Sequence, residues 1–405
     1  MIAHTDRLDS HAGPSVFRRR QLIVLGSDVT ALAVVRDAFH LGVSSVVVDN
    51  RSGIAAASRF AHAEIHAAAG TADLVPRIRA LAERAPSALL ATNDVWLRTI
   101  VANREELCAS GMDILHPNNA SLEICLDKRR FATWCAEAWL PAPRPYAVAS
   151  DAGAAADRAV EFPVLVRPAK TVHGKVIATA PKAVEVRSDR DLAHCLAGYR
   201  SAGAVPVVEE SLLGRRLQQF SVGAAVSASG MMTVVARKLR PLPDACAVGS
   251  LVEATEQPDV ERLARQALFA LDYHGIAEVE ILRDEDSGEA FLIEVNARPW
   301  LQFALAAARG RDLLAFALER RASVRAAPTP HSPQKALWLD FRNDLRVCFG
   351  EHGLVRTGRL GLGDYLRSIA HANVFARWSL SDPLPVWRDF STRVRGALGR
   401  ALRSR

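Results

Sequence analysis

The 405-residue sequence lacks several features that would assign it to a particular class of protein. It has no run of about 18 apolar residues, which is the length that a helix needs to cross a bilayer, so we expect no membrane-spanning segment. Residues 1–20 contain no apolar stretch of signal-peptide length. The six cysteines form no CxxC pair and stand near no histidine at zinc-finger spacing. This spacing favours free thiols over disulfides or a cysteine-bound metal, and the sequence predicts a cytoplasmic protein.

Aromatic residues are also scarce, at 6% of the chain, whereas the hydrophobic fraction of 49% is ordinary for a globular protein. The length predicts roughly two to three domains. A formal net charge of +7 suggests a nucleic-acid partner. A nucleic-acid surface interleaves basic and aromatic residues, however, and this pattern is present only weakly, in the C-terminal tail. We therefore expect no nucleic-acid partner.

The N-terminal region shows the pattern of an α/β domain. Residues 21–26 (QLIVLG) and 44–50 (SSVVVDN) read as buried strands joined by a helical segment, which predicts a βαβ unit and a parallel sheet. A further strand over 87–94 ends in the polar residues 92–94, at the sheet edge where open α/β sheets bind ligands. Gly26 stands without the other glycines of a G-x-G-x-x-G motif, so a dinucleotide site is the less favoured interpretation.

The remaining chain alternates between helical and strand periods. We expect helices over 129–139, 188–200, 259–275 and 302–322, and strands over 162–168, 176–180, 206–210, 218–229 and 231–240. Gly275 is expected to end the third of these helices. A proline-rich break at 327–334 separates this region from a tail over 335–405.

Two strand patterns on either side of residue 287 carry the most specific signal. Residues 275–282 (GIAEVEIL) and 291–299 (FLIEVNARP) flank an Asp-Ser-Gly turn, which predicts a β-hairpin. If the hairpin is centred near Ser287, Glu280 lies directly across from Glu294. Like charges that face each other across a ladder are destabilising, so this pairing indicates a cation between them.

The ligand set favours a hard divalent ion. Glu280, Glu294 and Asn296 offer only oxygen ligands, which indicate Mg²⁺ or Mn²⁺ rather than zinc. Arg298 lies two residues further along the same face and points into the same site. The alternative is a solvated sheet face with salt bridges, but the strongly apolar flanking residues argue against an exposed strand.

Five segments in this order resemble the ATP-grasp superfamily, most closely its carboxylate–amine ligase branch of D-aspartate ligase-like and biotin-carboxylase-like proteins. They are LDKRRF (126–131), FPVLVRPAK (162–170), VVEESLLG (207–214), ARKLRPLP (236–243) and the set Glu280, Glu294, Asn296 and Arg298. The resemblance implies an α/β fold class, in which a Rossmann-like parallel-sheet domain precedes a two-lobed α+β ATP-grasp domain. The implied boundaries are a disordered N-terminus (1–20), a pre-ATP-grasp domain (21–125), an ATP-grasp domain (126–325, with lobes 126–205 and 206–325) and a C-terminal extension (326–405).

The resemblance also implies roles for individual basic residues. Lys128 matches the lysine that reaches ATP from the start of the ATP-grasp domain. Arg167 stands where the family has a lysine on the α- and β-phosphates, so Lys170 or Lys175 is expected to supply the missing ammonium group. Lys238 and Arg240 are expected to face the phosphates or the acyl intermediate, and Arg298 to stabilise that intermediate.

Further positions are assigned to the nucleotide by the same resemblance. Glu209 and Glu210 match the hinge that hydrogen-bonds adenine, and Gln219 replaces the acid that binds the ribose. The implied reaction uses ATP and Mg²⁺ (or Mn²⁺) to join a small-molecule carboxylate to an amine, with release of ADP. Because Arg167 and Gln219 depart from the family pattern, a non-catalytic ATP-binding protein with a regulatory or assembly role is the alternative. The oligomeric state is not predicted.

The C-terminal tail is basic and amphipathic. Residues 386–404 place Trp387, Phe390 and Val394 against arginines, a pattern typical of helices that lie on anionic membranes. A terminal helix docked on the protein body explains the same pattern and is the interpretation we favour. Peripheral membrane contact through 386–405 is the alternative.

Overall fold

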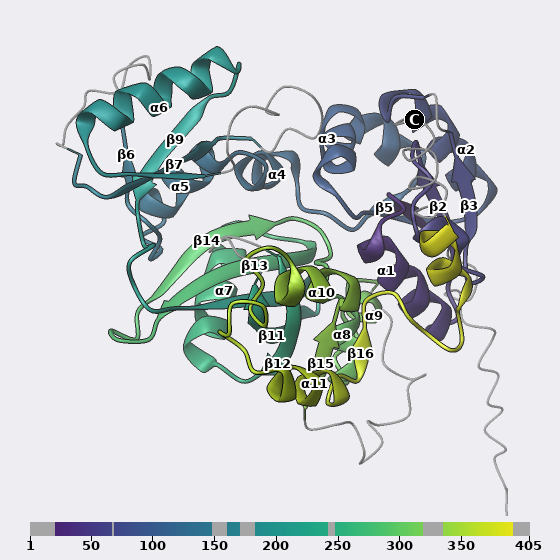
Figure 1. Cartoon of the computed structure of the whole chain (residues 1–405). Helices are drawn as coiled ribbons and strands as arrows, with labels where there is room; N and C mark the ends of the chain where they lie inside the picture. The colour runs from purple at the N-terminus through teal and green to yellow at the C-terminus, as the bar shows by residue number, and fades with distance from the viewer. Residues whose placement is uncertain are drawn as a thin grey trace, which may run out of the picture.

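A computed structural model describes residues 21–66, 69–147, 160–170, 183–241, 248–318 and 335–391, and three sheets organise them (Figure 1). The first is a five-stranded parallel sheet with the order β3-β2-β1-β4-β5. Its strands are β1 (Gln21–Leu25), β2 (Ser44–Asp49), β3 (His62–Ile65), β4 (Ser87–Ala91) and β5 (Asp113–Ile114). The predicted N-terminal α/β arrangement is therefore confirmed.

Helices cover both faces of this sheet because its strands are apolar on both sides. The helix α1 (Val29–His40) packs on the face that carries Leu22 and Val24. The helices α2 (Val75–Arg84) and α3 (Asp94–Ala109) pack on the face of Ile23 and Leu25. The strand predicted over 87–94 ends at Ala91, because Asn93 accepts a hydrogen bond from the Trp96 N–H and caps α3.

The second sheet is small and antiparallel, with the order β6-β9-β7-β8. Its strands are β6 (Pro145–Tyr146), β7 (Val164–Pro168), β8 (Val184–Val186) and β9 (Pro206–Glu210). The helix α6 (Asp189–Ser201), which Ser188 caps, buries Leu192 and Leu196 against this sheet. The helices α4 (Asn119–Cys125) and α5 (Lys128–Glu137) lead into the unit. The strand predicted over 176–180 lies outside the described residues.

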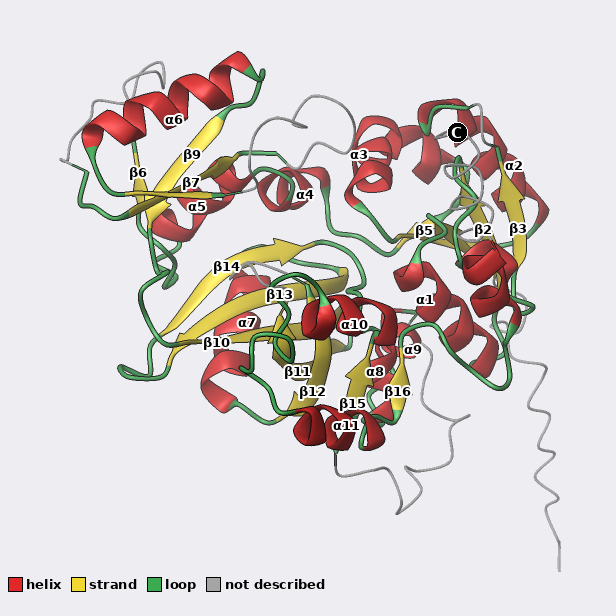
Figure 2. Ribbon diagram, viewed as in Figure 1, coloured by secondary structure: helices red, strands yellow, loops and turns green. Residues whose placement is uncertain are grey.

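The third sheet has seven strands in the order β14-β13-β10-β11-β12-β15-β16 and forms the largest layer (Figure 2). Its strands are β10 (Leu217–Ser227), β11 (Gly230–Pro241), β12 (Gly249–Thr255), β13 (Gly275–Asp284), β14 (Ala290–Asn296), β15 (Leu337–Leu339) and β16 (Val374–Phe375). The helix α7 (Pro258–Ala270) covers one face. The short helices α8 (Ala304–Ala308) and α9 (Leu313–Ala317) cover the other.

Two of the predicted helices differ from the observed ones. The helix α7 ends at Ala270 rather than at Gly275, and Asp272 adopts a φ of 47° just after it. Gly275 has a φ of +94° and begins β13, where a Cβ would lie 2.2 Å from the Leu115 carbonyl oxygen. The predicted helix 302–322 is split into α8 and α9, which are separated by Gly310 at a φ of +71°. Residues 319–322 lie outside the described part.

Residues 335–391 form the described part of the C-terminal extension. They contain β15, α10 (Phe341–Phe349), α11 (Leu362–Ala370) and β16, and the chain is helical again at 384–391. Through β15 the extension pairs with β12 of the central sheet. The extension then returns to the N-terminal domain (Figure 1), where the buried Asp382 accepts hydrogen bonds from Arg36 Nε (3.1 Å) and Ser58 Oγ (2.8 Å). Among the described residues, no helix is both long and apolar enough to cross a membrane.

Candidate functional site

The hairpin of β13 and β14 has the predicted register. Glu280 pairs with Glu294 and Glu278 with Asn296, after which a bulge shifts the ladder between Glu280 and Ile281. The Asn296 Nδ2 donates to Glu278 Oε2 at 3.1 Å and to Glu280 Oε1 at 3.4 Å. The carboxylates of Glu278 and Glu280 and the amide of Asn296 therefore lie together on one face of the hairpin.

Two lysines neutralise the facing acids. Lys238, on β11, donates to Glu280 Oε2 at 3.2 Å, and its side chain is only 6% exposed. Lys128, at the start of α5, donates to Glu294 Oε1 at 3.1 Å. Its backbone N–H also bonds the Ala169 carbonyl at 2.7 Å, which fixes the start of α5 against the small sheet. The structure thus brings both predicted lysines to the predicted acids.

Glu278 was not predicted as a site residue, although it shares a strand face with Glu280. Burial, and next the neighbouring Glu280 charge, raise the pKa of Glu278 to about 7. Ser221 Oγ donates to its Oε1 at 2.7 Å. Burial alone would raise the pKa of Glu280 too, but Lys238 and other nearby cations outweigh burial and lower it. Alternation along the strand was the signal that could have identified Glu278.

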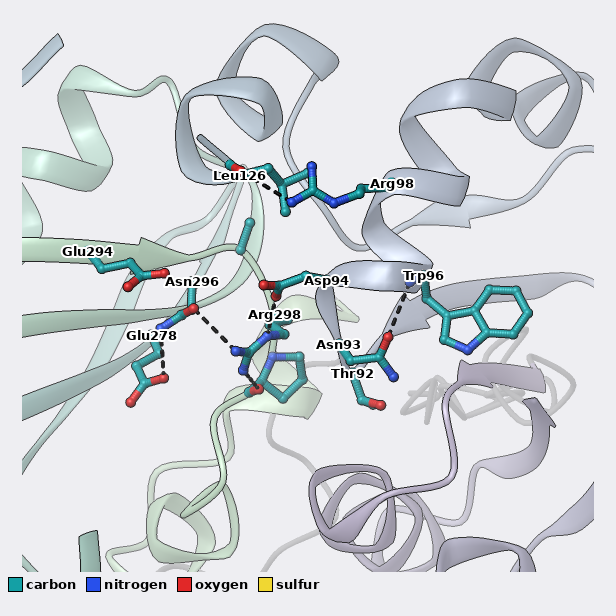
Figure 3. Close-up of polar contacts among 12 residues, drawn as sticks. Thr92, Asn93, Asp94, Trp96, Arg98, Leu126, Glu278, Glu294, Asn296 and Arg298 are labelled. Carbon is teal, nitrogen blue, oxygen red and sulfur yellow. Dashed lines mark hydrogen bonds and ion pairs between the residues drawn. The ribbon is translucent and has the colours of Figure 1, made fainter. Parts of the chain in front are cut away.

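Arg298 joins the acid hairpin to the edge of the parallel sheet (Figure 3). Its Nε donates to Asp94 Oδ1 at 2.9 Å, and its Nη2 donates to Asn296 Oδ1 at 3.2 Å. Burial lowers the pKa of Arg298, but the charges of Asp94 and Glu278 outweigh burial and raise it, so the guanidinium stays protonated. The polar tip predicted at residues 92–94 therefore reaches the site through Asp94.

Arg167, which stands where the family has a lysine, forms an ion pair. Arg167 on β7 donates a hydrogen bond from Nη2 to Glu209 Oε2 on β9 at 2.9 Å, and its Nε lies 2.8 Å from Glu209 Oε1 as an ion pair. The pair is buried, with 12% and 4% of the two side chains exposed. Burial raises the pKa of Glu209, and Arg167 opposes the shift. Glu209 thus orients Arg167, a contact that the sequence did not predict.

Glu210, Lys170 and Gln219, which were also predicted to bind the nucleotide, have other surroundings. Glu210 points to the opposite side of β9 and bonds Arg215 at 2.8 Å. Lys170 is 56% exposed and lies 3.6 Å from Asp127 Oδ2. Gln219 lies on β10, opposite Leu282. Lys175 is outside the described residues.

Arg240 does not join the site, contrary to the expectation that it faces the phosphates. Its side chain is 5% exposed and turns toward the C-terminal extension, where Nη1 lies 3.3 Å from Asp344 Oδ2. The register of β11 against β12 shifts between Lys238 and Arg240. This bulge separates the two side chains, which simple alternation would have placed together.

His116 is a second contact between domains that the sequence did not indicate. Its Nε2 accepts from the Ala91 N–H at 2.7 Å, so Nδ1 carries the proton and donates to the Ala297 carbonyl at 2.9 Å. Burial lowers its pKa to about 3, so the ring is neutral. The ring ties the end of β4 to the residue between Asn296 and Arg298. A lone histidine without periodic neighbours gave no sequence signal.

The donor set suits a cation that is shared with a ligand. Within the described ranges, no three His, Cys, Asp or Glu side chains converge as a closed metal site would require. Glu280 and Glu294 are instead neutralised by the ammonium groups of Lys238 and Lys128, which supply the positive charge that a metal ion would otherwise supply. Mg²⁺ takes few protein ligands and fills its octahedron with water and phosphate oxygens. The carboxylates of Glu280 and Glu294 and the amide of Asn296 fit this preference for few protein ligands.

Comparison with known proteins agrees with the geometry. Residues 127–320 match the family model described as the carbamoyl-phosphate synthase L chain, ATP binding domain. No curated protein matches the chain in sequence. Biotin carboxylase from Campylobacter jejuni, solved as a β-γ-ATP complex, superposes with a TM-score of 0.57 at 16% identity, over 77% of this chain and 72% of that one.

Two further solved structures have the same fold. L-amino acid ligase from Bacillus licheniformis gives a TM-score of 0.52 at 15% identity, over 69% of this chain and 67% of that one. Pyruvate carboxylase from Rhizobium etli gives 0.55 at 18% identity, over 78% of this chain. This chain spans only 29% of the length of that carboxylase. The family match over residues 127–320 and the shared fold agree with the resemblance to the ATP-grasp superfamily seen in the sequence.

Proposed function

We propose that this chain is an ADP-forming ligase that uses Mg-ATP to activate a small-molecule carboxylate for attack by an amine. The observation that carries the proposal is the Glu280–Glu294 pair with Asn296, surrounded by Lys128, Lys238 and Arg298. These side chains come from the start of α5, from β11 and from the β13–β14 hairpin. Two of the similar structures are a biotin carboxylase and an L-amino acid ligase, which supports the same class of reaction.

The proposed reaction has two steps. A carboxylate oxygen of the substrate bonds the γ-phosphorus of ATP while the bond from that phosphorus to the β-phosphate oxygen breaks, which releases ADP. The amine nitrogen then bonds the acyl carbon, the carbon–oxygen bond to phosphate breaks, and the amine loses a proton. In both steps negative charge spreads over phosphoryl oxygens, so positioning and positive charge supply most of the catalysis.

The side chains of the site divide this work. Glu280, Glu294 and Asn296 would hold Mg²⁺, which would supply positive charge against the phosphates when bound. Lys128 and Lys238 neutralise carboxylates in this structure; Lys128 would transfer its hydrogen bond to the bound nucleotide, and Lys238 to the phosphoryl group during its transfer.

The nucleotide itself is proposed to lie along the small sheet. Arg167 would bind the α- and β-phosphates with its orientation set by Glu209, and Lys170 or Lys175 would assist. Glu210 and Gln219 belong to the segments proposed to face adenine and ribose. Arg298 would stabilise the acylphosphate.

The test is ATP-dependent ADP release by the full chain, with Mg²⁺, over a panel of amino acids as carboxylates and amines. Glu294→Ala should lower turnover by about 100-fold or more, since it removes a ligand that acts on developing charge. Glu289→Ala is the matched control, because Glu289 lies on the same hairpin but is 65% exposed.

Each outcome has a defined meaning. Full activity of Glu294→Ala would refute the metal assignment. Mg-ATP binding by calorimetry without turnover on any substrate pair would support the alternative, a non-catalytic ATP-binding protein.

A further inference from the structure

The C-terminal extension reaches the strand that presents Lys238. Arg240 lies two residues further along β11, and its guanidinium is enclosed by α10 and α11 of the extension. Nη1 lies 3.3 Å from Asp344 Oδ2, and Nη2 donates to Ser368 Oγ at 2.5 Å. The guanidinium also lies over the Tyr365 ring, with Cζ 5.2 Å from its centroid. An arginine with this many partners fixes the backbone that carries it.

The same cluster also fixes the neighbouring strand. Ser250 on β12 donates to Asp344 Oδ1 at 2.7 Å, and both residues are buried, with 1% and 0% exposed. Asp344 therefore forms an ion pair with Arg240 of β11 and accepts a hydrogen bond from Ser250 of β12. It does so at the point where the register between these two strands shifts.

The register shift controls where Lys238 points. A bulge adds one residue to a strand and redirects the side chains beside it. Here the extra residue is Leu239, which separates Lys238, bonded to Glu280, from Arg240, bonded to the extension. Glu280 therefore binds Lys238 on one side of the bulge, and Asp344 binds Arg240 on the other. If the contacts of Arg240 are lost, the backbone movement reaches Lys238 through only two peptide units.

We infer that Arg240 is a positioning residue, through which the C-terminal extension holds β11 so that Lys238 faces Glu280. The significance of this for catalysis rests on the proposed function, in which Lys238 contacts the transferred phosphoryl group. The placement of Lys238 itself does not depend on that function. The extension thus supports the proposed ATP site from outside, since none of the contacts found for its residues 335–391 is with the site's own side chains.

The experiment measures the placement of Lys238 directly. The full chain is acetylated with an amine-reactive ester, and the rate at Lys238 is followed by mass spectrometry. In the wild type this lysine should react slowly, because its side chain is 6% exposed and paired with Glu280. Asp344→Asn removes the charged ion-pair partner of Arg240 and should raise the rate roughly tenfold, which corresponds to the loss of about 1.4 kcal/mol of ion-pair energy.

Asp382→Asn is the matched control. Asp382 is the same residue type in the same extension and is also 0% exposed, but its partners are Arg36 and Ser58 of the N-terminal domain. It should leave the Lys238 rate unchanged. A wild-type rate in Asp344→Asn would overturn the inference, and so would equal acceleration in both variants, which would show a general loosening of the extension.

Two further measurements complete the test. Ser368→Ala removes only the Nη2 partner of Arg240, so it decides the question if Asp344→Asn fails to fold by circular dichroism; acceleration supports the inference, and a wild-type rate refutes it. Where the wild type turns over ATP, Asp344→Asn should lower kcat about tenfold and leave the KM for ATP within about twofold, because phosphoryl transfer and not nucleotide binding is affected. Absence of wild-type turnover would refute the proposed function, while the acetylation rates would still decide the role of Arg240.

Discussion

Asp94 and Arg298 form an ion pair, with 2.9 Å between Oδ1 and Nε, that joins residues 204 positions apart. Asp94 opens α3 at the carboxyl edge of the parallel sheet, and Arg298 follows the strand that carries Glu294 and Asn296. Because Arg298 also donates to Asn296, the edge of the N-terminal sheet helps to orient one of the proposed metal ligands. Through the Asp94–Arg298 ion pair, the N-terminal domain contributes directly to the proposed site.

Asp94→Asn should therefore weaken both the fold and the site. The two side chains are 17% and 22% exposed, so the pair is screened only partly, and we expect the free energy of unfolding to fall by roughly 1–3 kcal/mol. Urea denaturation measures this change. The control is Glu106→Gln, which breaks an ion pair of equal length with Arg79 whose side chains are 43% and 39% exposed, and it should cost less than about 1 kcal/mol. Equal losses in the two variants would contradict the structural role of Asp94.

Gly275→Ala should be more destabilising than an ordinary glycine substitution. Gly275 combines a φ of +94° with a backbone oxygen, that of Leu115, 2.2 Å from where a Cβ would be. The φ alone costs about 1–3 kcal/mol for a residue with a side chain, and the clash adds to it. Gly111→Ala provides the comparison, because Gly111 has a φ of +77° but open space around it. Thermal melts measure both variants. An equal loss of stability in the two would mean that the backbone at Leu115 moves away from the new Cβ without an energetic penalty.

The acid hairpin could be predicted because its geometry is local. Side chains alternate along each strand and the Asp-Ser-Gly turn fixes the centre, so the pairing of Glu280 with Glu294 follows from counting. The strand and helix pattern of the parallel sheet was equally local. In both cases neighbouring residues alone determine the element and its face.

The remaining contacts depend on distant parts of the chain. The bulge at Leu239, which turns Arg240 away from the site, arises where β11 meets β12 and the extension. The residues next to Leu239 in the sequence do not predict this bulge. The pairing of Arg167 with Glu209 likewise requires β7 and β9 to be neighbours in a sheet. The helix α7 ends earlier than predicted because the chain leaves the helical conformation at Asp272, one of the few residue types besides glycine that tolerate a positive φ.

His116 should make the stability of the protein depend on pH. Its pKa is about 3 in the folded protein, against an ordinary value of 6.5, because burial disfavours the charged ring. Between these values the unfolded chain binds more protons than the folded one, so the stabilisation is complete above about pH 6.5 and is lost as the pH falls through this window. The loss should approach roughly 3–5 kcal/mol at the acid end.

The measurement is the urea midpoint of wild type and His116→Gln at several pH values between 7.5 and 4.5. Glutamine can accept from the Ala91 N–H and donate to the Ala297 carbonyl, yet it cannot gain a proton in this range. The wild type should therefore lose more stability than the variant on acidification. Other titrating groups are common to both proteins and cancel in the difference, so parallel curves would show that His116 does not titrate on unfolding.

The basic tail leads to a prediction about membrane contact. At 384–391 the polar side chains face the protein, where Arg388 contacts Ser52 and Asp389 lies 3.6 Å from Arg342. Trp387 and Phe390 are 68% and 60% exposed. The described start of the tail thus touches the body and still presents aromatic side chains outward, so docking and membrane contact are compatible. Arginines at 393, 395, 400 and 403 follow in the sequence, outside the described residues.

We therefore predict weak, salt-sensitive binding to vesicles that contain anionic lipid, because apolar insertion and charge attraction add together. The double substitution Trp387→Ser/Phe390→Ser should reduce vesicle flotation about tenfold or more, since each aromatic ring contributes on the order of 1–2 kcal/mol when it leaves water. Trp139→Ser is the control, because Trp139 is 93% exposed but lies outside the basic tail. Flotation that is absent from the wild type, or that falls equally in both variants, would leave docking on the protein body as the sole role of the tail.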